Sequence, residues 1–257
     1  MAFPLPNADQ RLDGQVAIVT GASSGLGWRF ARVLAAAGAT VAVTARRRDR
    51  LDALVAEIEA SGGKAAAFEL DCADPVQCEA IVDRVAAALG PVTILVNNAG
   101  IPDAQRAVKI DLALYDQVVN VNQRAPWLIS CALARNLIAA KTPGRIVNIA
   151  SIAAYEYGGG GAALYSVTKA AVVRMTEALA VEWAKFHINV NAIAPGAFSS
   201  EMMDGMLARI GDITSHFPRQ RLGQPEQMDS TLLFLCAPAS ECVTGTIVKI
   251  DDGQNRR

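Results

Sequence analysis

The 257-residue sequence has few histidines and no regular cysteine spacing, and both shortages exclude kinds of site. His187 and His216 are the only histidines, and their spacing is not that of metal ligands. We therefore expect no metal centre. The five cysteines form no C-x-x-C pair, which favours reduced thiols in a cytoplasmic protein over a disulfide framework.

The chain also lacks a strong charge of either sign and a long apolar run. Its formal net charge is −1, which argues against nucleic acid or an acidic membrane as the main partner. No apolar stretch approaches the ~20 residues of a membrane span. Residues 1–14 contain prolines and polar residues without the apolar segment of a signal peptide. We predict a cytoplasmic protein that does not enter a membrane.

Apolar residues are abundant, at 52% of the chain, and short apolar runs alternate with segments of helical periodicity. Such alternation is typical of a parallel sheet with right-handed crossovers and helices on both faces. With no break in composition, the sequence predicts one Rossmann-like, doubly wound α/β domain at 15–257 after an N-terminal arm at 1–14. The seven expected strands lie at 16–20, 40–44, 64–70, 92–96, 145–150, 187–192 and 246–250.

Two regions depart from this regular alternation. A long helical segment at 111–140 contains Pro126, which we expect to kink or restart the helix. Residues 194–225 show no clear period and contain several glycines and prolines. A loop of that length inside a compact domain usually carries function, so we assign it to the substrate.

A glycine-rich loop follows the first expected strand and has the pattern G-x-x-x-G-x-G, without the Gly-Lys-Ser/Thr ending of a P-loop. Glycines let the backbone approach a ligand, and the N-terminus of the next helix favours a pyrophosphate. An ordinary glycine-rich turn is the alternative, but the position in a β-α-β unit favours dinucleotide binding. The predicted contacts are Gly21, Ser23, Ser24, Gly25, Leu26 and Gly27.

Three arginines, Arg46, Arg47 and Arg48, end the second strand, where an acidic residue would bind the ribose of NAD. Guanidinium groups suit a 2′-phosphate instead. Basic residues are disfavoured at a helix N-terminus, so local preference does not explain the cluster. The alternative is a solvated basic helix start. We predict NADP(H) as the cofactor, bound by Arg46 and Arg47.

Tyr165 and Lys169 stand four residues apart in a helical segment that runs to about Trp183. This spacing places both side chains on one face of the helix. A neighbouring ammonium favours the phenolate, so we expect the pKa of Tyr165 to lie below its usual value of about 10. Taken alone, the pair is also compatible with a chance pairing on a solvated surface.

In chain order, these features resemble the short-chain dehydrogenase/reductase family over about residues 12–253. The resemblance lies in the loop Thr20–Gly27, in Asn97-Asn98-Ala99-Gly100, in Val121-Asn122, in Ser151, in Tyr165 with Lys169, and in Pro195-Gly196. It implies a catalytic tetrad of Asn122, Ser151, Tyr165 and Lys169, and a homotetramer. It further implies cofactor contacts from Asp71, Cys72, Asn98, Ala99, Gly100, Tyr165, Lys169, Pro195, Gly196, Phe198 and Ser200. Two departures are a serine at 200, where the family usually has threonine, and one extra residue between Ser151 and Tyr165.

The resemblance implies reversible hydride transfer between NADP(H) and a small ketone or secondary alcohol. Tyr165 would act as general acid, with its pKa lowered by Lys169, while Ser151 would bond the substrate oxygen and Asn122 would hold a water. The expected substrate walls are 102–106, 152–162 and 197–218. Their apolar side chains, which either face the substrate or pack a lid on the core, favour a hydrophobic ketone: Phe198, Met202, Met203, Met206 and Phe217.

Three other functions stay open. A 3-oxoacyl-carrier-protein or 3-oxoacyl-CoA reductase would need a basic surface at the mouth, for which Arg124, Arg135 and Arg174 are candidates. An NAD-dependent alcohol or polyol dehydrogenase would contradict the arginine argument. A sensor that binds cofactor without chemistry is disfavoured, because all four tetrad members are present.

Overall fold

The protein, a computed structural model described here for residues 6–159 and 161–255, contains a seven-stranded sheet. All strand pairs are parallel, in the order β3-β2-β1-β4-β5-β6-β7. The predicted parallel, doubly wound sheet is therefore confirmed, with its order reversing between β1 and β4. The strands are β1 (Val16–Thr20), β2 (Thr40–Ala45), β3 (Lys64–Glu69), β4 (Val92–Asn97), β5 (Gly144–Ile149), β6 (Ile188–Pro195) and β7 (Ile247–Ile250).

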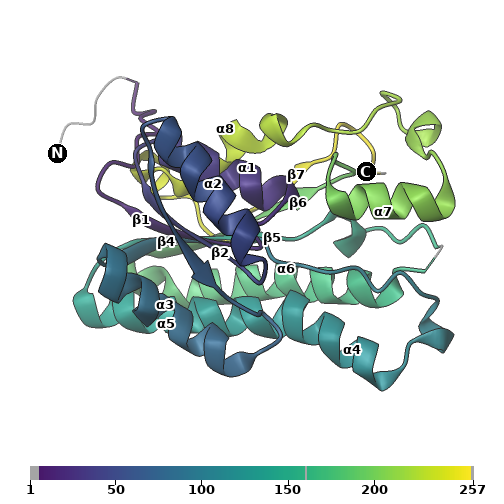
Figure 1. Ribbon diagram of the computed structural model, residues 1–257, viewed down its shortest axis with the longest axis horizontal. Coiled ribbons are helices and arrows are strands. Elements are labelled where there is room, and N and C mark those ends of the chain that lie inside the picture. The colour runs from purple at the N-terminus through teal and green to yellow at the C-terminus, as the bar shows by residue number, and fades with distance from the viewer. Residues whose placement is uncertain (1–5, 160, 256–257) are drawn as a thin grey trace.

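Helices cover both faces of the sheet, as predicted. One layer holds α1, α2 and α8, the other holds α3, α5 and α6, and α4 and α7 project at one end of the sheet (Figure 1). Their bounds are α1 (Gly25–Ala36), α2 (Arg48–Ala60), α3 (Pro75–Leu89), α4 (Leu112–Val119), α5 (Ala125–Ala140), α6 (Ala163–Trp183), α7 (Glu201–Ile210) and α8 (Asp229–Cys236). Among the described residues, no helix is both long and apolar enough to cross a membrane.

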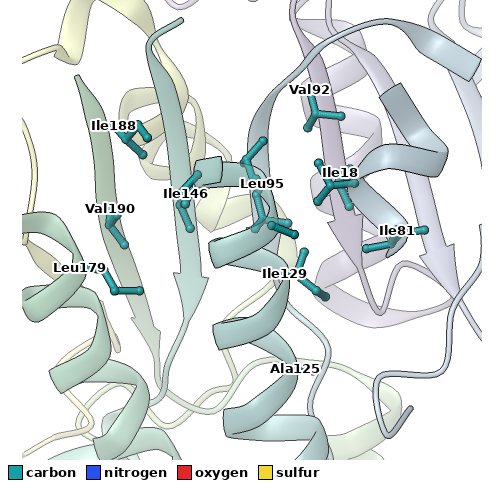
Figure 2. Close-up of a cluster of buried hydrophobic side chains, with 14 of the residues drawn as sticks. Ile18, Ile81, Val92, Leu95, Ala125, Ile129, Ile146, Leu179, Ile188 and Val190 are labelled. Atoms are coloured by element: carbon teal, nitrogen blue, oxygen red, sulfur yellow. The ribbon is translucent and has the colours of Figure 1, made fainter. Parts of the chain in front are cut away.

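The central strands are buried on both faces, which explains why they appear in the sequence as continuous apolar runs. On one face, alternate strand residues such as Ile18 and Ile146 pack against Ile81 of α3, Ile129 of α5 and Leu179 of α6 (Figure 2). The intervening strand residues pack against α1, α2 and α8 on the other face. The sheet is thereby fixed between two helical layers, and its carboxyl edge is held in place.

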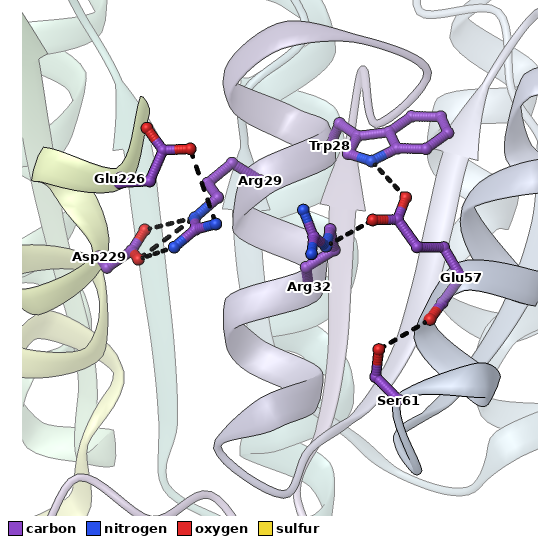
Figure 3. Close-up of polar contacts among 7 residues, drawn as sticks. All are labelled: Trp28, Arg29, Arg32, Glu57, Ser61, Glu226 and Asp229. Atoms are coloured by element: carbon purple, nitrogen blue, oxygen red, sulfur yellow. Dashed lines mark hydrogen bonds and ion pairs between the residues drawn. The ribbon is translucent and has the colours of Figure 1, made fainter. Parts of the chain in front are cut away.

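Polar contacts fasten α1 to the helices on either side of it (Figure 3). Trp28 Nε1 donates to Glu57 of α2 at 3.0 Å, and Arg32 pairs with the same carboxylate at 3.0 Å. On its other side, Arg29 Nε donates to Asp229 of α8 at 3.0 Å. These bonds position the helix whose N-terminus carries the glycine-rich loop.

The described part of the predicted N-terminal arm, residues 6–14, has no helix or strand. It is nevertheless anchored, because Leu12 is buried and its N–H donates to Ala37 O at 2.8 Å. Residues 1–5 of that arm lie outside the described residues.

The irregular turn expected at Pro126 lies directly before it, as a π-helical segment at Asn120–Arg124. Ala125 N donates to Asn120 O, five residues back. Pro126 has no N–H to donate, and it falls in the first turn of α5, where none is required.

The prediction that 194–225 lacks regular structure is wrong for α7. Ser200 Oγ accepts from Met203 N at 3.2 Å and so caps this helix, while Gly211 with φ +83° ends it. Met203, Met206, Leu207 and Ile210 follow helical spacing, so the sequence held a signal for α7. Gly205 in the middle of the helix weakened that signal.

Candidate active site

The glycine-rich loop is locked to the loop after β4 by a set of hydrogen bonds. Asn98 Nδ2 donates to Thr20 O at 2.9 Å and to Gly21 O at 3.2 Å. Thr20 Oγ1 accepts from Asn98 N and Ala99 N, both at 3.0 Å. The structure therefore brings together two motifs that are more than seventy residues apart in the sequence, at the carboxyl ends of β1 and β4.

Two glycines of this loop are required by its geometry. Gly21 has φ +66°, and a Cβ at Gly27 would lie 2.4 Å from both Asn98 Nδ2 and Gly21 O. At the start of α1, the side chain of Ser24 makes no capping bond, so the first-turn N–H groups have no side-chain acceptor there. Uncapped N–H groups at a helix N-terminus suit an anionic pyrophosphate, so the loop fits a dinucleotide.

Arg47 is the arginine of the cluster that lies against the loop. Its guanidinium donates to Ser23 Oγ and Ser24 Oγ at 3.0 Å and pairs with Glu201 Oε2 of α7 at 3.0 Å. Ser23, Ser24 and Glu201 also line a cavity of about 330 Å³. Arginine and serine donors on one side of the loop form a set that suits a phosphate.

The other two arginines are placed differently. Arg46 is exposed at the end of β2, and Arg48 is bonded to Asp52 of its own helix at 2.8 Å. Arg48 therefore pairs within its own helix, whereas Arg47 contacts the glycine-rich loop and pairs with Glu201.

Asp71 and Cys72 follow β3, at the edge of the sheet where the glycine loop also lies. Asp71 Oδ1 accepts from Ala73 N at 2.9 Å, and Ala73 O accepts from Arg124 at 3.0 Å. These bonds fix the turn in the shape that carries Cys72, which is partly buried.

The four predicted catalytic residues come from three parts of the chain and converge near the carboxyl end of β5. Ser151 follows β5, Tyr165 and Lys169 lie in α6, and Asn122 lies in the π-helical segment. Lys169 Nζ lies 5.6 Å from the centroid of the Tyr165 ring. A Cβ added at Gly100 would lie 3.4 Å from Lys169 Nζ and 3.5 Å from Asn122 Oδ1. The structure thus brings all four together.

Asn122 uses its side chain to join two walls of the site. Its Oδ1 accepts from Ile101 N at 2.8 Å, and its Nδ2 donates to Ile101 O at 2.9 Å and to Thr168 Oγ1 at 3.2 Å. The amide therefore ties the loop after β4 to α6, one residue away from Lys169.

Burial dominates the electrostatics of the Tyr165–Lys169 pair. It raises the pKa of Tyr165, against a smaller lowering by the hydrogen bond with Ser151. It also lowers the pKa of Lys169 to about 8. The direction for Tyr165 is opposite to the predicted one. The reason is that both groups leave water, while the ammonium is directed to Ile149 O, at 2.7 Å, instead of to the phenol.

The segment after β6 holds the last predicted cofactor residues. Pro195 ends β6, and Gly196 N donates to Ile250 O at 2.9 Å. Ser200 keeps its hydroxyl near Phe198 O, at 3.3 Å, while capping α7. Phe198 is only 4% exposed and packs against Gly223, which is in line with the alternative that this side chain packs on the core, while its contacts with cofactor and substrate stay predictions.

One residue that the sequence analysis missed is Asp103, a 3% exposed carboxylate. Its Oδ2 accepts from Leu164 N at 3.0 Å, beside Tyr165, and its Oδ1 accepts from Ala104 N at 3.0 Å. The N-cap residue of α6 is Ala162, which has no side chain to cap the helix. Asp103 caps it from a distant loop, and no local pattern could reveal that.

A polar contact reaches one of the expected substrate walls. Arg209 of α7 donates to Ala104 O at 3.4 Å, which brings a guanidinium to the 102–106 loop. Two of the three arginines considered for a basic surface already have partners: Arg124 donates to Ala73 O, and Arg174 pairs with Glu177 at 2.9 Å. In the described ranges, no group of three potential ligands for a metal ion occurs.

Comparison with known proteins gives one consistent result. The family described as short chain dehydrogenase matches residues 15–209. The 2-dehydro-3-deoxy-D-gluconate 5-dehydrogenase of Formosa agariphila is 32% identical, over 93% of this chain and 92% of its own. A 3-oxoacyl-acyl-carrier-protein reductase of Thermotoga maritima is 34% identical, over 95% and 98%. A short chain dehydrogenase from Burkholderia cenocepacia, solved in complex with NADP, superposes with a TM-score of 0.88 at 38% identity, over 96% and 100%.

Proposed function

The chain belongs to the short-chain dehydrogenase family, and from that premise we propose that it transfers a hydride between NADP(H) and a small ketone or secondary alcohol. The observation that carries the proposal is the convergence of Ser151, Tyr165 and Lys169 at the carboxyl edge of the sheet that also holds the glycine-rich loop. Active sites of open α/β sheets lie at this edge, beside the point where the strand order reverses.

The bound dinucleotide supplies or accepts the hydride. In reduction, the Tyr165 hydroxyl donates its proton to the carbonyl oxygen as general acid. Ser151 donates a hydrogen bond to the same oxygen and stabilises the charge that develops on it. Protonated Lys169 adds a positive charge near the phenol. Asn122 acts by position, because its amide fixes Ile101 and Thr168 around the reacting groups.

The preference for NADP(H) is supported by Arg47, whose guanidinium lies between the two serine hydroxyls of the loop. The Burkholderia cenocepacia relative was solved with NADP, in line with this proposal. We expect Arg47→Ala to raise the KM for NADPH by about tenfold or more and to leave that for NADH nearly unchanged, because only NADPH carries the 2′-phosphate. Equal effects on the two cofactors would contradict the assignment, and would favour the NAD-dependent alternative.

A ketone that bears a carboxylate is a second candidate substrate. Arg209 at the 102–106 loop favours it, and so does the burial of Phe198, which removes one apolar wall. The Formosa agariphila relative is named for a keto sugar acid, which has this chemistry. A 3-oxoacyl thioester remains the rival, in line with the name of the Thermotoga maritima relative.

The proposed enzyme is a cytoplasmic homotetramer. Large apolar side chains on α4, α5 and α6 are exposed and support burial against other copies: Leu112, Tyr115, Trp127, Val167 and Val181. Light scattering coupled to size exclusion measures the assembly directly. A monomer at micromolar concentration would contradict this part of the proposal.

The proposal is tested by following NADPH consumption with simple ketones, keto sugar acids and acetoacetyl thioesters, with NADH in parallel. Tyr165→Phe should lower turnover by about 10²- to 10⁴-fold while NADPH still binds, as checked by fluorescence titration. Tyr115→Phe removes the hydroxyl of a tyrosine of α4 that is not among the four proposed catalytic residues; it is the matched control and should keep full activity. A Tyr165→Phe enzyme with normal turnover would refute the mechanism.

A further inference from the structure

A second cavity, of about 540 Å³, lies at the edge of the sheet opposite the proposed active site. It is bounded by the segment from α5 to β5 and the segment from α6 to β6, with a wall from the turn after α8. These segments lead into the amino ends of β5 and β6, whereas Ser151 follows the carboxyl end of β5. A six-residue strand spans about 20 Å, so the two sites are separated by the height of the sheet.

The walls of this cavity combine an apolar surface with positive charge. Leu137, Ile138 and Phe186 are among the apolar lining residues. The lining cations are Lys141, Arg145 and Lys185, against one acidic residue, Glu241. A cavity of this size with apolar walls and a few convergent charges is typical of a site for a small organic molecule.

Helix ends explain two of the three cations. Lys141 is the C-cap of α5, and Lys185 lies in the short helical turn that follows α6. Cations are favoured near the C-termini of helices, because of the partial negative charge there. Neither lysine, taken alone, indicates a ligand.

Arg145 is different, because it lies on β5 and is only 9% exposed. Its Nη1 donates to Gly144 O at 2.9 Å, and its Nε has no hydrogen-bond partner in the described part of the chain. Burial lowers the pKa of this guanidinium, and Glu241 offsets that only in part. Glu241 comes within ion-pair distance of no cation in residues 6–159 and 161–255. A buried guanidinium with an unpaired N–H and no acidic partner within ion-pair distance is unfavourable, so an anion beside it would be stabilised.

We propose that this cavity binds a small organic anion, whose carboxylate or phosphate group accepts hydrogen bonds from Arg145 and whose apolar body lies against Leu137 and Phe186. Guanidinium groups match both kinds of anion, and Lys141 and Lys185 add charge at the rim. The cavity is separate from the proposed active site, so binding of an anion there does not depend on which substrate the enzyme uses.

The test uses 4-phenylbutyrate and phenyl phosphate as probes and neutral 4-phenylbutanamide as their control, titrated by calorimetry into the full-length protein saturated with NADP⁺. Both anions, or one of them, should bind with a stoichiometry of one per chain, and the amide should not. Arg145→Met should weaken binding by about tenfold or more, as expected for the loss of a charge-assisted hydrogen bond. Arg174→Gln removes an exposed cation of α6 outside the cavity and should change nothing.

Repeating the titration with Ser151→Ala distinguishes binding in this cavity from binding in the active site, because this variant should bind the anions as tightly as the wild type. Because Arg145→Met alters a buried residue, its fold and NADPH oxidation are checked first. The surface variant Lys141→Gln/Lys185→Gln provides a second test and should weaken binding several-fold. The proposal is overturned if neither anion binds, if the amide binds equally well, or if the variants at 141, 145 and 185 bind like the wild type.

Discussion

The burial of the Lys169 ammonium, whose charge the proposed mechanism uses, should lower the free energy of unfolding by a measurable amount. The pKa of Lys169 falls from 10.5 to about 8, because its ammonium is withdrawn from water. The unfolded chain therefore holds this proton more tightly than the folded one. The resulting loss of folding stability is fully present below pH 8 and disappears as the pH rises through 10.5. At about 1.4 kcal/mol per pKa unit, it amounts to about 3 kcal/mol at neutral pH.

Lys169→Met removes the charge but also the hydrogen bond to Ile149 O, which is worth about 1.5–3 kcal/mol. The two effects nearly cancel at neutral pH, so the pH dependence is the sharper test. Between pH 7 and about 9.5, the free energy of unfolding of the wild type should rise by about 2 kcal/mol relative to Lys169→Met. The variant should have lost most of its turnover at every pH.

Urea unfolding followed by circular dichroism, without cofactor and at fixed protein concentration, measures this difference. Lys109→Met removes an exposed lysine and is the control, for which the difference from wild type should not change with pH. If the difference between the wild type and Lys169→Met stays constant, or falls as the pH rises, then Lys169 is not destabilised by burial and the argument fails.

Three further outcomes follow from the same contacts. Gly27→Ala should lower the free energy of unfolding in urea by about 1–3 kcal/mol and weaken NADPH binding, because its Cβ would lie 2.4 Å from Asn98 Nδ2. An unchanged free energy of unfolding would show that the loop shifts to accommodate the Cβ. Asp103→Ala should lower both kcat and the free energy of unfolding, the latter by about 1–3 kcal/mol, because Leu164 N and Ala104 N lose their acceptors. Asp103→Asn offers one oxygen to these two N–H groups and should restore both quantities in part; losses equal to those of Asp103→Ala would point to the charge instead. In pH profiles, kcat/KM for reduction should fall above pH about 8 as Lys169 loses its proton in the free enzyme, and a profile flat to pH 9.5 would argue against any need for its charge.

Local patterns in the sequence were enough to predict the sheet and the closeness of Tyr165 to Lys169, whereas Ser151 and Asn122 entered the predicted site through the family resemblance. Most strands contain a short apolar run, and the i, i+4 spacing of Tyr165 and Lys169 needs only a helix to bring them together. Parallel strands then place Ser151 at the same edge. These features depend on neighbours in the chain, which is why the sequence shows them.

The direction of the Tyr165 pKa could not be predicted in the same way, because spacing gives proximity and not burial. A lysine one turn away lowers a tyrosine pKa only if its ammonium points at the phenol oxygen in a medium that does not penalise both charges. Here, Ile149 O takes the ammonium. That acceptor is twenty residues away in the sequence and belongs to β5, so only the fold reveals it.

The least predictable part of the site is the placement of α7, which makes one long-range polar contact near each of its ends. At its start, Glu201 pairs with Arg47 beside the glycine loop, and near its end Arg209 reaches Ala104 O. The ion pair has side chains 44% and 52% exposed, so it contributes at most about 1 kcal/mol, and the 3.4 Å bond adds little. These two polar contacts therefore contribute little to holding α7 in place. Since the 2′-phosphate proposed for Arg47 would compete with Glu201 for the same guanidinium, we expect cofactor binding to loosen the start of α7 and leave its end in place.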